Sequence, residues 1–286
     1  MTTKLAKRIG FCFGVRRAVS LAEAALKRDG EAHSLGSIIH NPQVVARLSK
    51  KGLKVADNVA AIKSGTVVVS SHGISPKISR SIKKRGLKLI DTTCPFVLNA
   101  QRIVRSLSGD GYKVIILGEA RHPEVKALVD FASLDTIVVR DKSEASKLKI
   151  SNNDYIGIIS QTTQSTDNFL DVVETIRKKR PRELKIINTI CKDVEERQRA
   201  ARILAKKVDA MLIVGGKNSA NTKRLFEICR KLQKNSHLVE TEKEIARGWF
   251  KPNSIIGVTS GASTPDWLVK KVINAIREKG GCIING

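Results

Sequence analysis

The sequence predicts an α/β fold of three small domains related by a pseudo-threefold axis, in a trefoil arrangement. Three cysteines each stand directly before a helical pattern. Each pattern is followed by an apolar strand that ends in a polar loop, and a second strand and polar loop then follow in every case. Such alternation is typical of parallel sheets covered by helices. Because ligand sites in these sheets lie beyond the carboxyl ends of the strands, we expect the loops to face a shared centre.

The three cysteines introduce the three helices. Cys12 precedes FGVRRAVSLAEAALKR, whose apolar residues recur at helical spacing. Cys94 precedes PFVLNAQRIVRSL, which has a proline at the first helical position, where its missing N–H costs least. Cys191 precedes KDVEERQRAARILAKK, whose early acidic residues suit the positive end of a helix dipole. Two of the cysteines also share a preceding strand and turn, LKLIDTTC and LKIINTIC, which indicates duplication.

The first polar loop of each repeat stands at a constant distance from its cysteine. The three loops read GSIIHNPQVV, GEARHPEVKAL and GKNSANTKRL. One residue in each loop lies 28 positions after its cysteine, and these residues are His40, His122 and Ser219. Three equal offsets support a repeated unit.

The second polar loop of each repeat follows the second apolar strand. These segments read TVVVSSHGISP, YIGIISQTTQS and SIIGVTSGASTPDW, and they offer His72, Thr162 and Ser263. A further helical stretch follows each loop. We therefore expect three α/β repeats and a C-terminal tail, at residues 1–93, 94–190, 191–270 and 271–286.

Composition narrows the classes of function. A formal net charge of +25 favours anionic partners, yet the basic residues stand mostly in short runs typical of solvated helix ends. Aromatic residues make up only 4%, which leaves few platforms for stacking bases, so nucleic acid is an unlikely partner. The charged segment MTTKLAKRIG lacks a long apolar run, so we expect neither a signal peptide nor a membrane anchor, and a cytoplasmic location.

The five cysteines do not form a disulfide framework in such a setting, which leaves burial, catalysis or metal ligation. A single buried cysteine usually serves as a small hydrophobe. Threefold placement of Cys12, Cys94 and Cys191 favours ligation, and thiolates select zinc, copper(I) or iron–sulfur clusters. Three ligands on a cubane cluster leave one iron open to a substrate. Cys229 lies on a helical stretch and is interpreted as core, whereas Cys282 lies in the tail and has no assigned role.

The polar loops indicate an anionic substrate. Their side chains are neutral or cationic donors beside helix N-termini, which suits a diphosphate, and they are His40, His72, His122, Ser219, Asn221 and Ser263. Glu124 is the exception, and two interpretations of it stay open. It is either a proton carrier whose pKa is raised by seclusion, or an acid that serves the helix dipole.

Eight motifs together resemble a known family. They read GFCFGVRRAV, IIHNPQVV, SSHGISP, DTTCP, GEARHPEV, SQTTQS, KNSANT and GVTSGASTPDWLV, and they run in order from about residue 9 to residue 270. The set is similar to that of the LytB-type 4-hydroxy-3-methylbut-2-enyl diphosphate reductases. This resemblance implies three α/β domains around a central 4Fe-4S cluster with three cysteine ligands, which match Cys12, Cys94 and Cys191.

The resemblance also implies a reaction. The substrate is an allylic diphosphate whose hydroxyl binds the open iron. Two electrons and protons arrive, water leaves, and isopentenyl and dimethylallyl diphosphates result, as the last step of the methylerythritol phosphate route to isoprenoids. Glu124 matches the proton donor and Thr162 the hydroxyl at the alcohol end of the substrate.

The other site residues match diphosphate ligands and one further pocket residue. His40 and His72 match diphosphate-binding histidines, and His122 a third histidine of the pocket. Further matches to diphosphate ligands are Ser219, Asn221 and Ser263. One departure is Ala220, which stands where the family often has a second serine, so one hydroxyl contact is lost.

Two alternative functions remain, and the charge of the chain also indicates a protein partner. A zinc-dependent hydrolase would use the thiolates and a histidine, although His-rich sites suit a zinc-bound water better. A basic RNA-binding protein with a structural metal would retain RNA in a salt-dependent manner. The basic surface suits an acidic electron donor such as ferredoxin or flavodoxin through charge steering.

Overall fold

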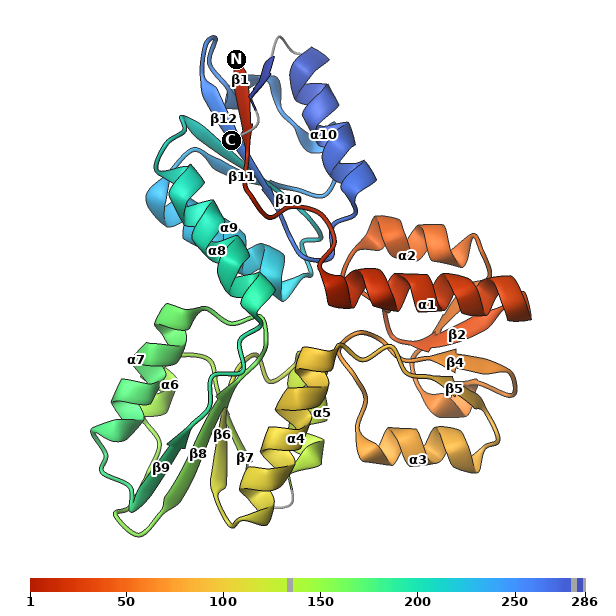
Figure 1. Cartoon of the computed structure of the whole chain (residues 1–286), viewed down its shortest axis with the longest axis vertical. Helices are drawn as coiled ribbons and strands as arrows, with labels where there is room; N and C mark the ends of the chain where they lie inside the picture. The colour runs from red at the N-terminus through yellow and green to blue at the C-terminus, as the bar shows by residue number, and fades with distance from the viewer. Residues whose placement is uncertain (133–135, 279–281, 285–286) are drawn as a thin grey trace. The chain divides into compact units, whose positions relative to one another are not determined.

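The computed structural model describes residues 1–132, 136–278 and 282–284 (Figure 1). The chain divides into two compact units. The first unit comprises Met1–Arg16, Ile39–Ala46 and Lys192–Gly286, and the second comprises Arg17–Ile38 and Arg47–Cys191. Helices α1 (Phe13–Asp29) and α2 (Pro42–Ser49) have residues in both units. Within the described ranges, the helices are too short or too polar to cross a membrane.

The first unit contains a parallel sheet in the order β11-β10-β12-β1-β13. Its strands are β1 (Thr2–Leu5), β10 (Ala210–Val214), β11 (Ser236–Val239), β12 (Ile255–Ser260) and β13 (Cys282–Ile284). Its helices are α8 (Lys192–Ala205), α9 (Ala220–Leu232) and α10 (Asp266–Glu278), with 3₁₀ turns at Glu242–Glu244 and Arg247–Trp249. Every strand is parallel because each connection between successive strands crosses over through a helix or long loop.

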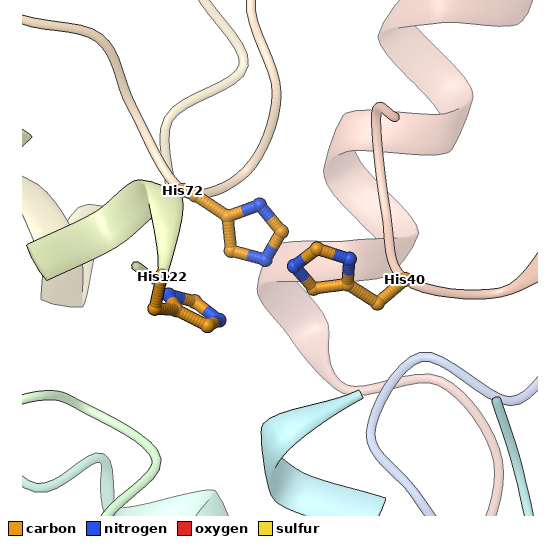
Figure 2. A group of neighbouring side chains, drawn as sticks. All are labelled: His40, His72 and His122. Carbon is orange, nitrogen blue, oxygen red and sulfur yellow. The ribbon is translucent and has the colours of Figure 1, made fainter. Parts of the chain in front are cut away.

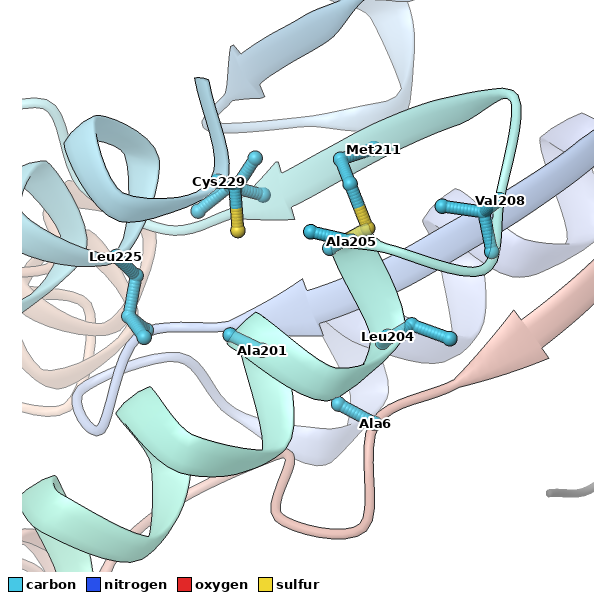
Figure 3. Close-up of a cluster of buried hydrophobic side chains, with 9 residues drawn as sticks. Ala6, Ala201, Leu204, Ala205, Val208, Met211, Leu225 and Cys229 are labelled. Atoms are coloured by element: carbon cyan, nitrogen blue, oxygen red, sulfur yellow. The ribbon is translucent and has the colours of Figure 1, made fainter. Parts of the chain in front are cut away.

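Strand β10 shows how this sheet forms two cores. All five of its residues are buried, which is typical of a parallel strand with helices on both faces. Met211 packs with Cys229 and residues of α8 and α9 (Figure 3), and Ile213 belongs to the same cluster. Leu212 and Val214 point to the other face and pack with residues of α10. Cys229 is therefore a core residue, as predicted, and burial raises the pKa of its thiol to about 12.

The second unit contains two further parallel sheets. One has the order β3-β2-β4-β5, and its strands are β2 (Ala32–Leu35), β3 (Leu53–Ala56), β4 (Thr66–Val68) and β5 (Lys88–Ile90). The other has the order β7-β6-β8-β9, and its strands are β6 (Lys113–Leu117), β7 (Thr136–Val139), β8 (Tyr155–Ser160) and β9 (Glu183–Ile186). The helices are α3 (Pro76–Lys84), α4 (Pro95–Gly109), α5 (Pro123–Phe131), α6 (Lys142–Ser146) and α7 (Thr166–Arg177), with a 3₁₀ turn at Val59–Ala61.

The three sheets repeat one topology. The first two strands of a repeat pair with each other, and the third strand pairs on the far side of the first, as in β7-β6-β8. The strand directly before a cysteine then completes the sheet, as β5 does before Cys94 and β9 before Cys191. The predicted α/β fold with three repeated parts is confirmed in this shared strand order.

The sheets depart from the expected bounds in two places. Residues 1–93 were expected to form the first repeat, yet β1 pairs with β12 and so fills the last-strand position in the sheet of the third repeat. This follows from the shared topology, because the strand before each cysteine belongs to the preceding repeat's sheet. Residues 271–286 were expected as a tail. They contain most of α10, and β13 pairs with β1. The side chain of Cys282 lies outside the described part of the structure.

Candidate functional site

The three predicted cysteines occupy one local geometry. Each directly follows the turn after a last strand and directly precedes a helix: α1 after Cys12, α4 after Cys94 and α8 after Cys191. Each backbone N–H donates to a carbonyl of the neighbouring polar loop, with N···O distances of 3.0, 3.0 and 2.9 Å. The acceptors, in the same order, are the carbonyls of Ala262, Ser71 and Thr162. All three thiols are half-buried, so the repeats present three equivalent sulfur donors.

The thiol of Cys12 has charged neighbours. Burial raises its pKa above the ordinary value, and the carboxylate of Asp193 raises it further. The N–H of Val15, 3.4 Å from Sγ, and the guanidinium of Arg197 lower it. Burial has the largest effect, so the pKa of the Cys12 thiol stays above its ordinary value in the protein without metal, and metal binding would have to displace its proton.

The first polar loop of each repeat ends in a helix cap. His122 Nδ1 accepts the N–H of Glu124 at 3.2 Å, and Ser219 Oγ accepts the N–H of Thr222 at 3.3 Å. In the remaining repeat the cap is Asn41, whose Oδ1 accepts the N–H of Val44 at 3.1 Å. The equivalent positions are therefore Asn41, His122 and Ser219, and the equal offset of 28 placed His40 one residue too early. An extra residue in the Cys12 repeat causes this difference.

The second residue of each capped helix carries an amide or a carboxyl group. These residues are Gln43, Glu124 and Asn221. Asn221 is 4% exposed, and neither atom of its carboxamide has a hydrogen-bond partner within the described protein. A buried polar group in this state costs about 1–3 kcal/mol. Hydrogen bonds from a ligand to the Asn221 carboxamide would remove that cost, so Asn221 is suited to bind a ligand.

Glu124 is the most secluded of the three. Its Oε1 accepts the N–H of Thr162 at 2.6 Å, and its Oε2 accepts the Thr162 hydroxyl at 2.9 Å. The residue is 1% exposed, and burial raises the pKa of the carboxyl to about 7 despite these two donors. A carboxyl with this pKa holds a proton through part of the neutral range, as the proton-carrier interpretation requires.

Hydrogen bonds from the cysteines show which positions of the second polar loops are equivalent. The acceptors for the cysteine N–H groups define Ser71, Thr162 and Ala262 as equivalent. His72 and Ser263 follow this position, and the matching residue of the middle repeat is Thr163. Thr162 therefore stands one position before the residue that is equivalent to His72 and Ser263. Its role differs accordingly, because its carbonyl binds Cys191 and its hydroxyl binds Glu124.

The predicted histidines fall in both units. His72 and His122 belong to the second unit, and their rings meet edge to face at 5.1 Å between centroids (Figure 2). His40 belongs to the first unit, where its carbonyl accepts the Ser263 hydroxyl at 3.1 Å. Burial, and next the charge of Lys223, lower the pKa of His40. A Cβ on Gly216 would lie 2.6 Å from the His40 carbonyl, so glycine permits this close approach.

Sequence patterns missed three buried residues beside the predicted ones. Gln161 is 1% exposed; its Oε1 accepts the N–H of Glu119 at 3.1 Å, and its Nε2 donates to the Thr163 hydroxyl at 3.0 Å. Asn41 was missed because the histidine beside it fitted the equal offset. Arg197 was missed because it lies in a helix rich in charged residues, where a buried charge has no distinct pattern.

Comparisons with known proteins agree with one another over the length of the chain. A family model described as LytB protein matches residues 3–277. The 4-hydroxy-3-methylbut-2-enyl diphosphate reductase of Geobacter metallireducens is 47% identical over 275 residues, which cover 96% of each chain. The enzyme of the same name from Geobacter sulfurreducens is 45% identical and covers 97% of this chain and 98% of that one.

Solved structures give the same result. A structure of (E)-4-hydroxy-3-methyl-but-2-enyl diphosphate reductase, described as the terminal enzyme of the non-mevalonate pathway, is 40% identical with a TM-score of 0.69. The alignment covers 97% of this chain and 99% of that one. The E-1-hydroxy-2-methyl-but-2-enyl-4-diphosphate reductase of Plasmodium falciparum is 28% identical, with a TM-score of 0.91, and the alignment covers 100% of this chain and 92% of that one.

Proposed function

The chain belongs to the LytB protein family, and from this premise we propose that it reduces 4-hydroxy-3-methylbut-2-enyl diphosphate, in the last step of the non-mevalonate route to isoprenoids. The chain is an oxidoreductase. The reaction takes up two electrons and two protons, breaks the allylic C–O bond and releases water. One proton leaves with the oxygen, the other joins carbon, and the products are isopentenyl and dimethylallyl diphosphates.

One observation in this chain carries the proposal. A secluded carboxyl, Glu124, contacts Thr162 through two hydrogen bonds, and the carbonyl of Thr162 accepts the N–H of Cys191 at 2.9 Å. A proton source and a sulfur ligand are thus joined through a single residue. Loss of hydroxide from carbon requires an acid, and this arrangement supplies one beside a metal ligand.

Thr162 suits both charge states of Glu124. A hydroxyl is a donor and an acceptor, so it donates to the carboxylate and accepts from the carboxylic acid. Glu124 therefore loses and regains a proton without leaving its oxygen atoms unpaired. We propose that Glu124 protonates the departing oxygen of the substrate and that Thr162 orients that oxygen.

Donors from the polar loops would hold the diphosphate. Asn221 has a buried carboxamide without a partner among the described residues. Ser219 caps the start of α9, and Ser263 lies in the loop before α10. Helix N-termini bind phosphate through backbone N–H groups and the helix dipole. We assign the diphosphate to these residues together with His40 and His72, and we assign His122 to the same pocket.

The thiols fit the iron–sulfur cofactor of the family. Three half-buried cysteines in one repeated geometry offer soft donors of the type that such clusters select. We propose that Cys12, Cys94 and Cys191 hold a 4Fe-4S cluster with one iron open to the substrate. When bound, this cluster supplies the electrons and a Lewis-acidic iron for the substrate oxygen.

We propose a small acidic electron-transfer protein, such as a ferredoxin or a flavodoxin, as the electron donor. The formal charge of +25 would accelerate its encounter with the chain through long-range attraction. The rate of reduction by such a donor should therefore fall as salt is added, whereas the rate with a small neutral reductant should change little.

The decisive experiment prepares the protein without oxygen. We expect a brown protein with a broad visible absorption band and about four irons per chain, since one 4Fe-4S cluster holds four irons. The protein should turn over the allylic diphosphate when a reductant is added. A colourless protein that holds zinc and hydrolyses the diphosphate would contradict the proposal. So would a protein that retains RNA and keeps its full stability after the metal is removed.

His40→Ala should weaken binding of diphosphate ligands about ten- to a hundredfold and leave the cluster spectrum unchanged. One donor to a charged oxygen contributes about 1.5–3 kcal/mol, which sets this range. Titration calorimetry of each protein with the diphosphate product, carried out without oxygen, measures the change in affinity. His237→Ala is the matched control, because His237 stacks on Trp249 and bonds Asn235. If His40→Ala binds both substrate and product as tightly as wild type does, the assignment of His40 to the diphosphate site is wrong.

A further inference from the structure

The turn before each cysteine is held to the end of a central strand. In the turn before Cys94, the hydroxyl of Thr92 donates to the carbonyl of Val69. In the turn before Cys191, the hydroxyl of Thr189 donates to the carbonyl of Ser160 at 2.5 Å. Both threonines stand two residues before their cysteine, and both carbonyls belong to the same position of the repeat. The shared bond fixes the direction from which each cysteine approaches its helix.

The turn before Cys12 lacks that threonine. Gly10 takes the equivalent place, with φ of +78°, and a Cβ there would lie 1.7 Å from Asp266 Oδ1. The positive φ favours glycine here, and glycine has no side-chain hydroxyl to offer to the strand end. The connection is also longer, since residues 6–11 join β1 to Cys12 whereas residues 91–93 join β5 to Cys94.

Arg197 supplies the missing bond. The carbonyl equivalent to those of Val69 and Ser160 is that of Ser260, and it accepts from Arg197 Nη1 at 3.3 Å. The same Nη1 donates to the carbonyl of Arg8 at 3.4 Å, within the longer connection itself. Ser260 also holds this connection through its hydroxyl, which accepts the N–H of Gly10 at 2.8 Å. All of these residues lie in the first unit.

The burial of this guanidinium is specific to one repeat. Arg197 stands six residues after Cys191 and is 2% exposed, whereas the equivalent residues after Cys12 and Cys94 are the buried Ala18 and Ala100. A buried charge is costly unless it is paired. Asp193 pairs with it, with 2.7 Å between Nε and Oδ2. One repeat therefore replaces a small apolar residue with an ion pair, at the one turn that lacks the threonine.

We infer that Arg197 is a positioning residue for Cys12: its guanidinium clamps the Arg8–Gly10 segment to the end of β12 and so holds the first cysteine ligand in place. This inference rests on the proposed role of Cys12 as a cluster ligand. Its test has one part that does not depend on the cluster.

Arg197→Met removes the clamp and keeps most of the side-chain volume. We expect amide hydrogen exchange in residues 6–12 to accelerate about ten- to a hundredfold, with exchange in β10 unchanged. Iron release from the anaerobic holoprotein to a chelator should accelerate in the same range. Arg199→Met is the matched control, since Arg199 is exposed on the same helix, and it should match wild type in both measurements.

Two results would overturn the inference. In one, Arg197→Met matches wild type in exchange and iron release. In the other, exchange rises equally in residues 6–12 and in β10, which is the mark of general destabilisation. If Arg197→Met does not fold, Arg197→Lys decides, because it keeps the positive charge that pairs with Asp193 but lacks the planar set of donors that reaches the Arg8 and Ser260 carbonyls. It should accelerate exchange in residues 6–12, and an unchanged rate contradicts the clamp. A wild type without iron would contradict the proposed function, while the exchange measurements would still test Arg197.

Discussion

Cys191→Ser is expected to lose most of its iron and sulfide and to lower turnover about a hundredfold or more. A serine oxygen is a harder and far more basic donor than a thiolate, so it replaces sulfur poorly on iron. Loss of groups that only orient ligands already costs 10–100-fold in metal affinity or activity, which sets the lower limit for loss of a ligand. Iron and sulfide analysis, with a visible spectrum, measures the outcome on protein purified without oxygen.

Cys229→Ser is the matched control for the same chemical change. Cys229 is fully buried between α9 and β10, where a new hydroxyl without a partner costs about 1–3 kcal/mol of stability. We expect a lower melting temperature and an unchanged cluster. Cys12→Ser and Cys94→Ser should resemble Cys191→Ser, because the three N–H groups share one geometry. Full iron content and wild-type turnover in Cys191→Ser would refute three-cysteine ligation.

The repeated topology could be predicted because it leaves local marks. The segments before Cys94 and Cys191 are alike in sequence, and the hydrogen bonds of Thr92 and Thr189 now explain that likeness. The partner of the N-terminal strand left no such mark. β1 pairs with β12, about 250 positions away, and a short apolar strand does not specify a neighbour at that distance.

The repeat position given to His40 was wrong by one residue for a related reason. A helix cap depends on backbone conformation and on which side chain reaches the free N–H groups, and counting from a cysteine does not register an added residue. His40 was therefore aligned with the wrong position of the other repeats. The role proposed for His40 in diphosphate binding does not depend on this alignment and stays a prediction.

Arg197 could not be predicted from its own helix. Seven of the fourteen residues of α8 are charged, so one buried arginine is hidden among exposed ones. A comparison of the repeats would have raised the question, because alanines occupy the equivalent positions Ala18 and Ala100. The answer required the carbonyls of Arg8 and Ser260, which meet the guanidinium only after folding.

The free energy of unfolding should depend on pH through the titration of Glu124. Its pKa is about 7 in the folded chain and about 4.5 in the unfolded chain, so between these values the folded state binds more protons. The contribution of Glu124 to the free energy of unfolding is then greatest below about pH 4.5. It decreases as the pH rises to about 7, by roughly 3 kcal/mol in total. Glu124→Gln should lose this dependence, and Glu119→Gln, which alters an exposed carboxyl of the same loop, should retain it.

Glu124→Gln should also lower turnover about 10²–10⁴-fold, while substrate still binds and still shifts the cluster spectrum. Glutamine keeps the size of the side chain and can bond Thr162, but it has no proton to give. In wild type, turnover should fall as the pH rises through about 7, because the protonated fraction of Glu124 falls there. Single-turnover rates against pH measure this, with Glu119→Gln as control. Normal turnover in Glu124→Gln would transfer the acid role to the substrate diphosphate or to water. Glu124 would then be only an acid at a helix start, despite being buried against Thr162.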